Sequence, residues 1–191
     1  MKGAQLDLFD DPLIPGLATA GGIITPAQER ALIARIDEEA LAPFRFQGWE
    51  GKRLTQSFGW SYDFEGGGVA QADPIPDWLL PLRELAARFS GLDAEALVQT
   101  LLIRYDPGAG IGWHKDRPVF GDVVGISLGS AASLRLRRRK ERGFTRVSVP
   151  LEPRSAYHLT GEVRHAWEHS IVPMEEARWS VTFRTLAPDA K

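Results

Sequence analysis

The residues with the clearest chemical potential are His114 and Asp116, which a single residue separates in a Gly-Trp-His-Lys-Asp string. In an extended segment, residues i and i+2 point to the same side, so an imidazole and a carboxylate here can reach one metal ion. One further imidazole would complete a facial triad and leave positions of an octahedral iron open for other ligands. A His-x-Asp pair alone is also found in ordinary surface turns. The candidates for the third ligand are the remaining histidines, His158, His165 and His169.

A second set of polar residues alternates along the segment 178–184. One face of this expected strand carries two arginines with two hydroxyls between them: Arg178, Ser180, Thr182 and Arg184. The Cα atoms of the two arginines are roughly 20 Å apart in an extended strand. Their long side chains could close from both ends on a short dicarboxylate through bidentate hydrogen bonds. The alternative is an exposed strand with solvated arginines.

The composition restricts the kind of metal site. The chain has 191 residues, 43% of them hydrophobic, which fits one domain with a substantial core. It contains no cysteine, so disulfides, thiolate metal sites and iron–sulfur clusters are excluded. A metal held only by imidazole and carboxylate ligands points to non-haem iron or a harder divalent ion.

The N-terminus lacks the pattern of a secretory signal, and no apolar run approaches the roughly 20 residues of a membrane span. We therefore expect a cytoplasmic protein without a membrane partner. The net charge is only −2, but the segment 135–146 holds seven Arg or Lys residues and one acid. This basic run is compatible with a nucleic-acid partner, and equally with a solvated hairpin. The residues expected to contact phosphates are Arg137, Arg138, Arg139 and Lys140.

The elements that must position these residues begin with two helices. Residues 1–22 are expected to form a flexible arm. Thr25-Pro26-Ala27-Gln28 has the N-cap, proline and capping-box glutamine of a helix start, so a helix is expected to about Ala40. A second helix is expected over 76–90. Between them, aromatic residues alternate over 58–64, which predicts a strand with one aromatic face.

After residue 97 the chain is rich in short strands separated by turn signals. We expect strands near 99–105, 122–128, 132–139, 144–149, 155–160, 167–172 and 178–186. Helices followed by a run of strands favour an α+β fold with an antiparallel sandwich or barrel.

Three strings together resemble the AlkB family of 2-oxoglutarate oxygenases. They begin at Arg104 (RYDPGAGIGWHKD), at Trp167 (WEHSI) and at Arg178 (RWSVTFR), and they follow the family's HxD…H…Rx5R order. The resemblance covers roughly residues 55–186. It implies a double-stranded β-helix (jelly-roll) core at about 97–187, within a single oxygenase domain over 23–191 that also contains N-terminal helices and a lid strand.

The resemblance also implies roles for individual residues. The iron ligands are His114, Asp116 and His169, because His169 matches the family's aromatic-x-His context better than the other two histidines do. The 2-oxoglutarate contacts are Tyr105, Arg178, Arg184 and Ser180. Where AlkB has asparagine, this chain has Ile103 and Ser180, which should alter cosubstrate contacts without removing the charge pairs.

The activity implied is an Fe(II)-, 2-oxoglutarate- and O₂-dependent oxidative demethylation of N-alkylated bases in DNA or RNA. Single strands are the expected substrate, and the protein is expected to be a monomer. The base would be extruded and stacked against a lid formed by Trp60, Tyr62 and Phe64, unless these rings are only the buried face of a strand. Base-repairing relatives place an acid where this chain has Pro118, which leaves open a protein or small-molecule substrate. A metal-free jelly-roll binding module is the remaining alternative.

The N-terminal string Gln5-Leu6-Asp7-Leu8-Phe9 is a further candidate for binding. It resembles the short QLxLF-type peptides that dock on the bacterial replication sliding clamp. Two apolar anchors and a glutamine, here Gln5, Leu6, Leu8 and Phe9, suit a pocket on a partner. A similar start is also common among AlkB relatives, so the motif has an alternative explanation.

Overall fold

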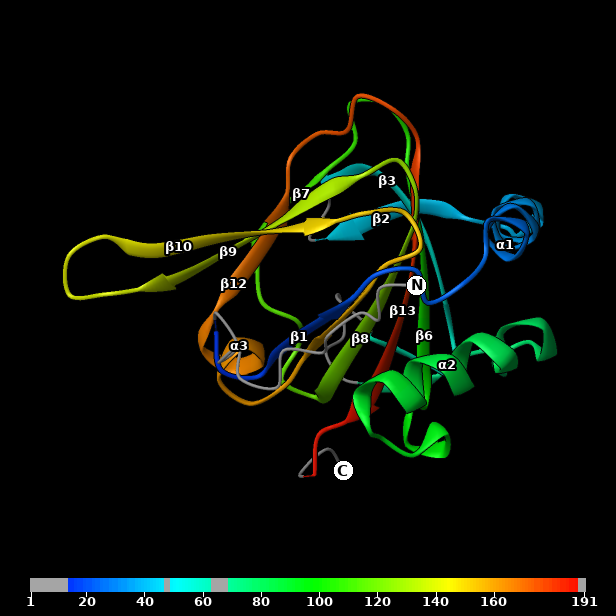
Figure 1. The fold of residues 1–191 in the computed structure, drawn as a ribbon, viewed down its shortest axis with the longest axis horizontal. Helices are drawn as coiled ribbons and strands as arrows, with labels where there is room; N and C mark the ends of the chain where they lie inside the picture. Colours follow the sequence, from blue (N-terminus) through cyan, green and yellow to red (C-terminus); the bar gives the residue numbers. More distant parts are fainter. Residues whose placement is uncertain (1–13, 47–48, 63–68, 189–191) are drawn as a thin grey trace, which may run out of the picture.

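The computed structural model describes residues 14–46, 49–62 and 69–188, and everything said of the fold concerns these residues. Two antiparallel sheets pack against each other, and helices cover the outer face of the larger sheet (Figure 1). The Gln-Leu-x-Leu-Phe string and Phe64 lie outside the described residues. Among the described residues, no helix is long and apolar enough to span a membrane.

The larger sheet has the strand order β1-β11-β8-β13-β6-β3-β2. Its strands are β1 (Leu17–Ala20), β2 (Ala42–Phe46), β3 (Trp49–Phe58), β6 (Gln99–Tyr105), β8 (Phe120–Gly129), β11 (Ala156–Leu159) and β13 (Arg178–Leu186). The smaller sheet has the order β10-β9-β12-β7. Its strands are β7 (Ile111–His114), β9 (Ala132–Arg139), β10 (Phe144–Leu151) and β12 (Glu168–Ile171). From β6 to β13 the chain changes sheet at almost every strand, so the predicted jelly-roll, or double-stranded β-helix, is confirmed.

The remaining elements surround this core. They are the helices α1 (Pro26–Glu38), α2 (Leu80–Ser90) and α3 (Gly161–Ala166), the short 3-10 helices η1 (Asp77–Leu79) and η2 (Ala94–Ala96), and the strand pair β4 (Trp60–Tyr62) and β5 (Val69–Gln71). The capping box of α1 is present: Gln28 N donates to Thr25 Oγ1 and Thr25 N donates to Gln28 Oε1. Glu29 then joins α1 to the sheet, because it accepts from Arg154 at 2.7 Å and from Gly129 N at 3.0 Å.

Two separate cores explain why the larger sheet is buried on both faces. One core lies between the sheets and includes Ile103, Leu134 and Leu136. The other lies between the larger sheet and helices α1 and α2, and it includes Val181 and Phe183 of β13. Because strand side chains alternate, the opposite face of β13 must point between the sheets. The polar residues of β13 are therefore held inside the jelly roll.

The structure departs from two sequence predictions. Residues 14–22 do not belong to a flexible arm: Ile14 is 1% exposed, and β1 pairs with β11. The aromatic residues of 58–64 do not form one alternating strand, because the chain turns at Gly59, which has φ +74°. Phe58 ends β3 in the core, whereas Trp60 and Tyr62 belong to β4.

Gly59→Ala should be strongly destabilising. A Cβ there would lie 2.0 Å from the carbonyl oxygen of Val98, and the positive φ is strained for alanine. We expect a loss of about 3 kcal/mol or more in the free energy of unfolding, measured by urea denaturation. Gly91→Ala is the matched control: its φ is +70°, but nothing lies within 4 Å, so the loss should be about 1 kcal/mol. Equal losses would contradict the steric argument.

Candidate metal centre and its cavity

Three side chains predicted as metal ligands come together between the sheets. The ligand atoms of His114, Asp116 and His169 all lie within 4.8 Å of one another, the only such group of metal-binding side chains in the described part of the chain. Strand pairing explains this meeting: β12 lies beside β7 with His169 opposite His114, and the two ring centroids are 4.2 Å apart.

The other histidines are not part of this group, although His165 lines the same cavity. His165, a candidate for the third ligand from the sequence, belongs to α3 rather than to a strand with His169. His158 lies on β11 with its Nε2 3.4 Å from Asp122 Oδ1. Geometry therefore favours His169 as the partner of His114 and Asp116.

Arg184 controls the orientation of the Asp116 carboxylate. Its Nη2 donates to Asp116 Oδ1 at 2.9 Å, while Oδ2 lies 3.8 Å from His169 Nε2 and faces the histidines. Burial alone would raise the pKa of Asp116, but the nearby cations, Arg184 foremost, hold it well below its usual range. The carboxyl is therefore ionised at neutral pH, as a metal ligand must be.

Both histidines are held in the neutral form that binds metals. Burial, together with the neighbouring His114, lowers the pKa of His169 to about 3 against the attraction of Asp116. Burial also lowers the pKa of His114, whose Nδ1 is 2.9 Å from Gly112 O. Neutral imidazoles and an ionised carboxylate within one small volume fit a divalent iron ion.

Arg164 of α3 fixes the loop that carries Asp116. Its side chain, in a residue only 4% exposed, donates to the backbone carbonyls of Arg117, Phe120 and Gly121 at 2.8, 2.5 and 2.7 Å, and more distantly to that of Asp116. One side chain thus joins several carbonyls of this loop, of which that of Arg117 also accepts from Phe120 N at 3.0 Å. Arg164 could not be predicted from the sequence, because no local motif connects it to a loop more than 40 residues earlier.

The triad lines one side of a cavity of about 810 Å³. The expected cosubstrate residues also line it: Tyr105, Arg178, Ser180 and Arg184. Arg178 is 1% exposed; its Nε donates to Ser127 Oγ, and its Nη1 is buried without a hydrogen-bond partner among the described residues. An unpaired buried guanidinium nitrogen is costly, and a carboxylate would satisfy it. The site therefore fits a dicarboxylate, and the alternative of solvated arginines on an exposed strand is contradicted.

The predicted lid residues are only partly near this cavity. Tyr62 lines it, with the guanidinium of Arg117 4.7 Å from its ring centroid. Trp60 is on the same short strand but is not among the lining residues. The alternation of aromatic residues therefore did not identify the residues that line the cavity. Phe44 of β2 and Arg53 of β3 line it without an evident sequence signal.

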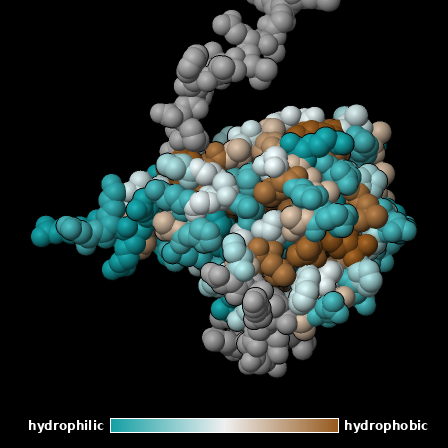
Figure 2. Space-filling model, turned by 90° about the horizontal axis from the view of Figure 1, so that it is seen from below, coloured by the Kyte–Doolittle hydropathy of each residue, from teal (hydrophilic) through white to brown (hydrophobic). Residues whose placement is uncertain are grey.

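The basic run forms a hairpin, β9–β10, that projects from the molecule (Figures 1 and 2). Arg137 is packed rather than free: its guanidinium lies 4.4 Å from the ring centroids of both Trp113 and Phe144, and it pairs with Glu168. Arg138 pairs with Glu162. The remaining exposed cations near the tip are Arg139, Lys140, Arg142 and Arg146.

Comparison with known proteins agrees with this geometry. A family model described as the 2OG-Fe(II) oxygenase superfamily matches residues 20–184. The chain is 28% identical over 173 residues to the tRNA (carboxymethyluridine(34)-5-O)-methyltransferase alkbh8 of Xenopus tropicalis, and 26% identical over 193 residues to the alkylated DNA repair protein ALKBH8 homolog of Arabidopsis thaliana. Each alignment covers 87% of this chain, but only 27% and 54% of the respective relatives, so the chain spans about half or less of their length.

Two solved structures share the fold. OsALKBH1 superposes with a TM-score of 0.63 at 16% identity, covering 91% of this chain and 98% of that one. A Pseudomonas putida prolyl-4-hydroxylase superposes with a TM-score of 0.60 at 17% identity, covering 90% of this chain and 93% of that one. At these identities the likeness concerns the fold alone.

Arg164→Met should destabilise the protein, because it removes the hydrogen bonds that a buried guanidinium donates to the backbone carbonyls of this loop. We expect a loss of about 2–4 kcal/mol in the free energy of unfolding, measured by urea denaturation. Arg35→Met removes an arginine whose side chain is 52% exposed and paired with Glu38, so it should cost less than about 1 kcal/mol. A loss no larger than that of the control would show that Arg164 does not hold the loop.

The metal-free protein should lose stability on acidification. The pKa of His169 falls from 6.5 in the unfolded chain to about 3 in the folded protein, so between these values the unfolded state binds more protons. Stability is then fully present above about pH 6.5 and declines as the pH falls towards 3. Urea midpoints at several pH values check this, and His169→Gln should flatten the decline. A midpoint that rises on acidification would contradict the assigned burial.

Proposed function

The chain is an AlkB-like member of the 2OG-Fe(II) oxygenase superfamily, and from this membership we propose that His114, Asp116 and His169 hold the Fe(II) ion. We further propose that Arg178 pairs with the distal carboxylate of 2-oxoglutarate. The observation that carries the proposal is the position of the triad in the same cavity as the unpaired, buried Nη1 of Arg178.

When bound, Fe(II), 2-oxoglutarate and O₂ supply an oxidation: one oxygen atom converts a substrate C–H to C–OH, and the other ends in succinate as CO₂ leaves. The chain's own residues position these components. Arg184 holds Asp116 in one orientation, and Arg164 holds the loop behind it. Tyr105 lies beside Arg178, with the guanidinium 5.1 Å from its ring centroid, and Ser180 occupies the same face of β13. We assign these two residues to cosubstrate binding.

For the substrate we propose an N-methylated nucleobase in single-stranded DNA or RNA, as in alkylation repair. Hydroxylation of the N-methyl group gives N–CH₂OH, whose C–N bond breaks to release formaldehyde while the hydroxyl proton is released or moves to the ring nitrogen. Support comes from the projecting basic hairpin, whose Arg137 lies over the cavity-lining Trp113, and from the two ALKBH8 relatives, one named for tRNA and one for alkylated DNA repair. Single-stranded nucleic acids bind to basic surfaces that carry aromatic side chains.

A protein or small-molecule substrate is the second candidate. It is favoured by Pro118, which lines the cavity where base-repairing relatives have an acid. We also propose that the protein acts in the cytoplasm as a monomer. Residues 5–9 would dock on a sliding clamp. Those residues lie outside the described part of the chain, so the clamp contact stays a sequence prediction.

The proposed activity is tested in two steps. Anaerobic addition of Fe(II) and 2-oxoglutarate should produce a metal-to-ligand charge-transfer band, and His169→Ala should remove it. Admission of O₂ with a methylated single-stranded oligonucleotide should then give formaldehyde and succinate in equal amounts. The absence of the band would contradict the oxygenase proposal. Succinate without oligonucleotide-dependent formaldehyde would favour the second candidate.

The hairpin should contribute to substrate binding through charge. Arg139→Gln/Lys140→Gln should raise the KM for the oligonucleotide by roughly ten-fold at low salt and reduce its salt dependence, because two phosphate contacts are lost. Arg30→Gln/Arg88→Gln removes the same charge from exposed positions on α1 and α2, on the side away from the hairpin (Figure 1), and should leave the KM unchanged. Equal effects of both pairs would show that only net charge matters.

A further inference from the structure

The cavity over the proposed metal centre is strongly cationic. Among the described residues that line it there is one carboxylate, Asp116, against six arginine or lysine side chains: Arg53, Lys115, Arg117, Arg164, Arg178 and Arg184. The formal charges of Fe(II) and the 2-oxoglutarate dianion cancel each other. The cosubstrate therefore does not neutralise the excess of Arg53, Lys115, Arg164, Arg178 and Arg184 over Asp116, and the substrate meets this positive charge.

Most of these cations already have a structural task, but Arg53 does not. Arg184 pairs with Asp116, Arg164 binds backbone carbonyls, and Lys115 donates to His165 O. Arg53 is 8% exposed, and its contact among the described residues is the ring of Phe44, whose centroid lies 3.9 Å from its guanidinium carbon. No acid or carbonyl among the described residues accepts a hydrogen bond from it, so its donors are available to a ligand.

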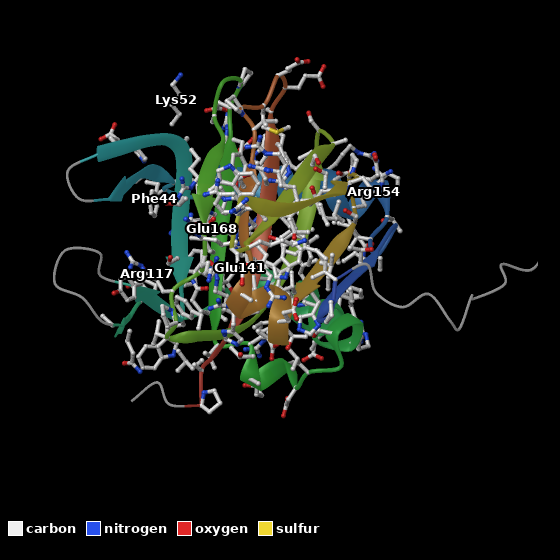
Figure 3. The ribbon with its side chains drawn as sticks, turned by 90° about the vertical axis from the view of Figure 1, so that its left-hand side faces the viewer. Phe44, Lys52, Arg117, Glu141, Arg154 and Glu168 are labelled. Atoms are coloured by element: carbon white, nitrogen blue, oxygen red, sulfur yellow. The ribbon has the colours of Figure 1, made fainter. Side chains whose placement is uncertain are left out.

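Arg53 stands where a substrate would approach the metal. On β3 it precedes Leu54, the partner of Arg104, and so it lies beside Tyr105. It is near enough to His114 for its charge to lower the pKa of that imidazole. Phe44 and Arg117 also line the cavity, and they lie on the same side of the molecule (Figure 3). Arg53 thus lines the same cavity as the triad, in contact with Phe44 and close enough to His114 to affect it.

We propose that this cavity receives an uncharged, carbonyl-bearing base of the uracil or thymine type, and that Arg53 is the side chain that selects it. The inference rests on the nucleobase substrate proposed above. A guanidinium held over a ring presents paired N–H donors that suit carbonyl oxygens. A cationic base, such as 3-methylcytosine or 1-methyladenine, would be placed beside an uncompensated buried charge, and Pro118 supplies no acid to offset it.

The oxidation is the same for neutral and cationic bases, so the preference between them must come from binding. On a neutral base, the N–CH₂OH group collapses to formaldehyde and N–H, and the hydroxyl proton moves to the ring nitrogen. On a cationic base the same collapse releases a proton to solvent. Neither path requires Arg53 to exchange a proton. Its role is to favour one bound base over another, which should affect kcat/KM ratios between substrates.

The test compares two single-stranded oligonucleotides of one sequence that carry either 3-methyluracil or 3-methylcytosine. The methyl group is at the same ring position in both, and the bases differ mainly in charge. The wild-type protein should prefer 3-methyluracil in kcat/KM for formaldehyde release, on the order of ten-fold or more. Arg53→Gln should reduce that preference by about the same factor. Arg88→Gln, which removes an exposed arginine from α2, should leave the preference intact.

The other outcomes separate the two proposals. Equal use of both bases, a preference for 3-methylcytosine, or a preference unaffected by Arg53→Gln would overturn the inference while the nucleobase function stands. A raised KM for 2-oxoglutarate in Arg53→Gln, with the base preference unchanged, would overturn it by making Arg53 a cosubstrate residue. If neither oligonucleotide binds or reacts although the charge-transfer band forms, both proposals fail. The same band shows that the variant is folded and loaded.

Discussion

The ion pair between Asp116 and Arg184 is the interaction on which the metal centre depends. A single carboxylate, 10% exposed, lies among buried cations, and without Arg184 at 2.9 Å burial would favour its protonated form. The pair fixes one carboxylate oxygen and leaves the other towards the histidines. It also fixes the position of the loop between β7 and β8, because Arg184 projects from a central strand of the sheet. The ligand geometry is therefore set by the rigid sheet and not by the loop itself.

This arrangement requires a sheet that is buried on both faces. Strand β13 places Val181 and Phe183 against the helices, and the alternate residues towards the cavity. Buried arginines are tolerated there because neighbouring strands supply their partners: Gln99 accepts from Arg184 at 2.8 Å, and Ser127 accepts from Arg178 at 3.2 Å. Helices α1 and α2 thus act on the site indirectly, by providing the apolar burial that keeps a polar strand face inside the protein.

Local periodicity predicts the elements well, whereas contacts between distant residues escape it. The strands 99–105, 132–139 and 178–186 have the predicted bounds, because alternation and turn residues are local signals. The family resemblance predicted His169 as the third ligand. The pairing of β12 with β7 explains why His169 lies opposite His114. Arg53, Arg164 and the turn at Gly59 could not be found in this way. Their importance comes from backbone groups and cavities formed by residues far away in the sequence.

The cavity has two proposed tasks, binding of the cosubstrate and selection of the substrate, and different cations serve each. The proposed binding of a dianion needs cations near the metal, and Arg178 and Arg184 would supply them from one strand. Four further basic residues, on β3, on the loop after β7 and on α3, exceed that need. Some of this excess has a structural explanation, since Arg164 binds carbonyls that a neutral side chain could not satisfy as fully. Arg53 has no such structural explanation. The desolvation of a buried cation that contacts only a ring is unfavourable unless a ligand offsets it. We therefore assign Arg53, which lies beside Tyr105 and near His114, to substrate selection.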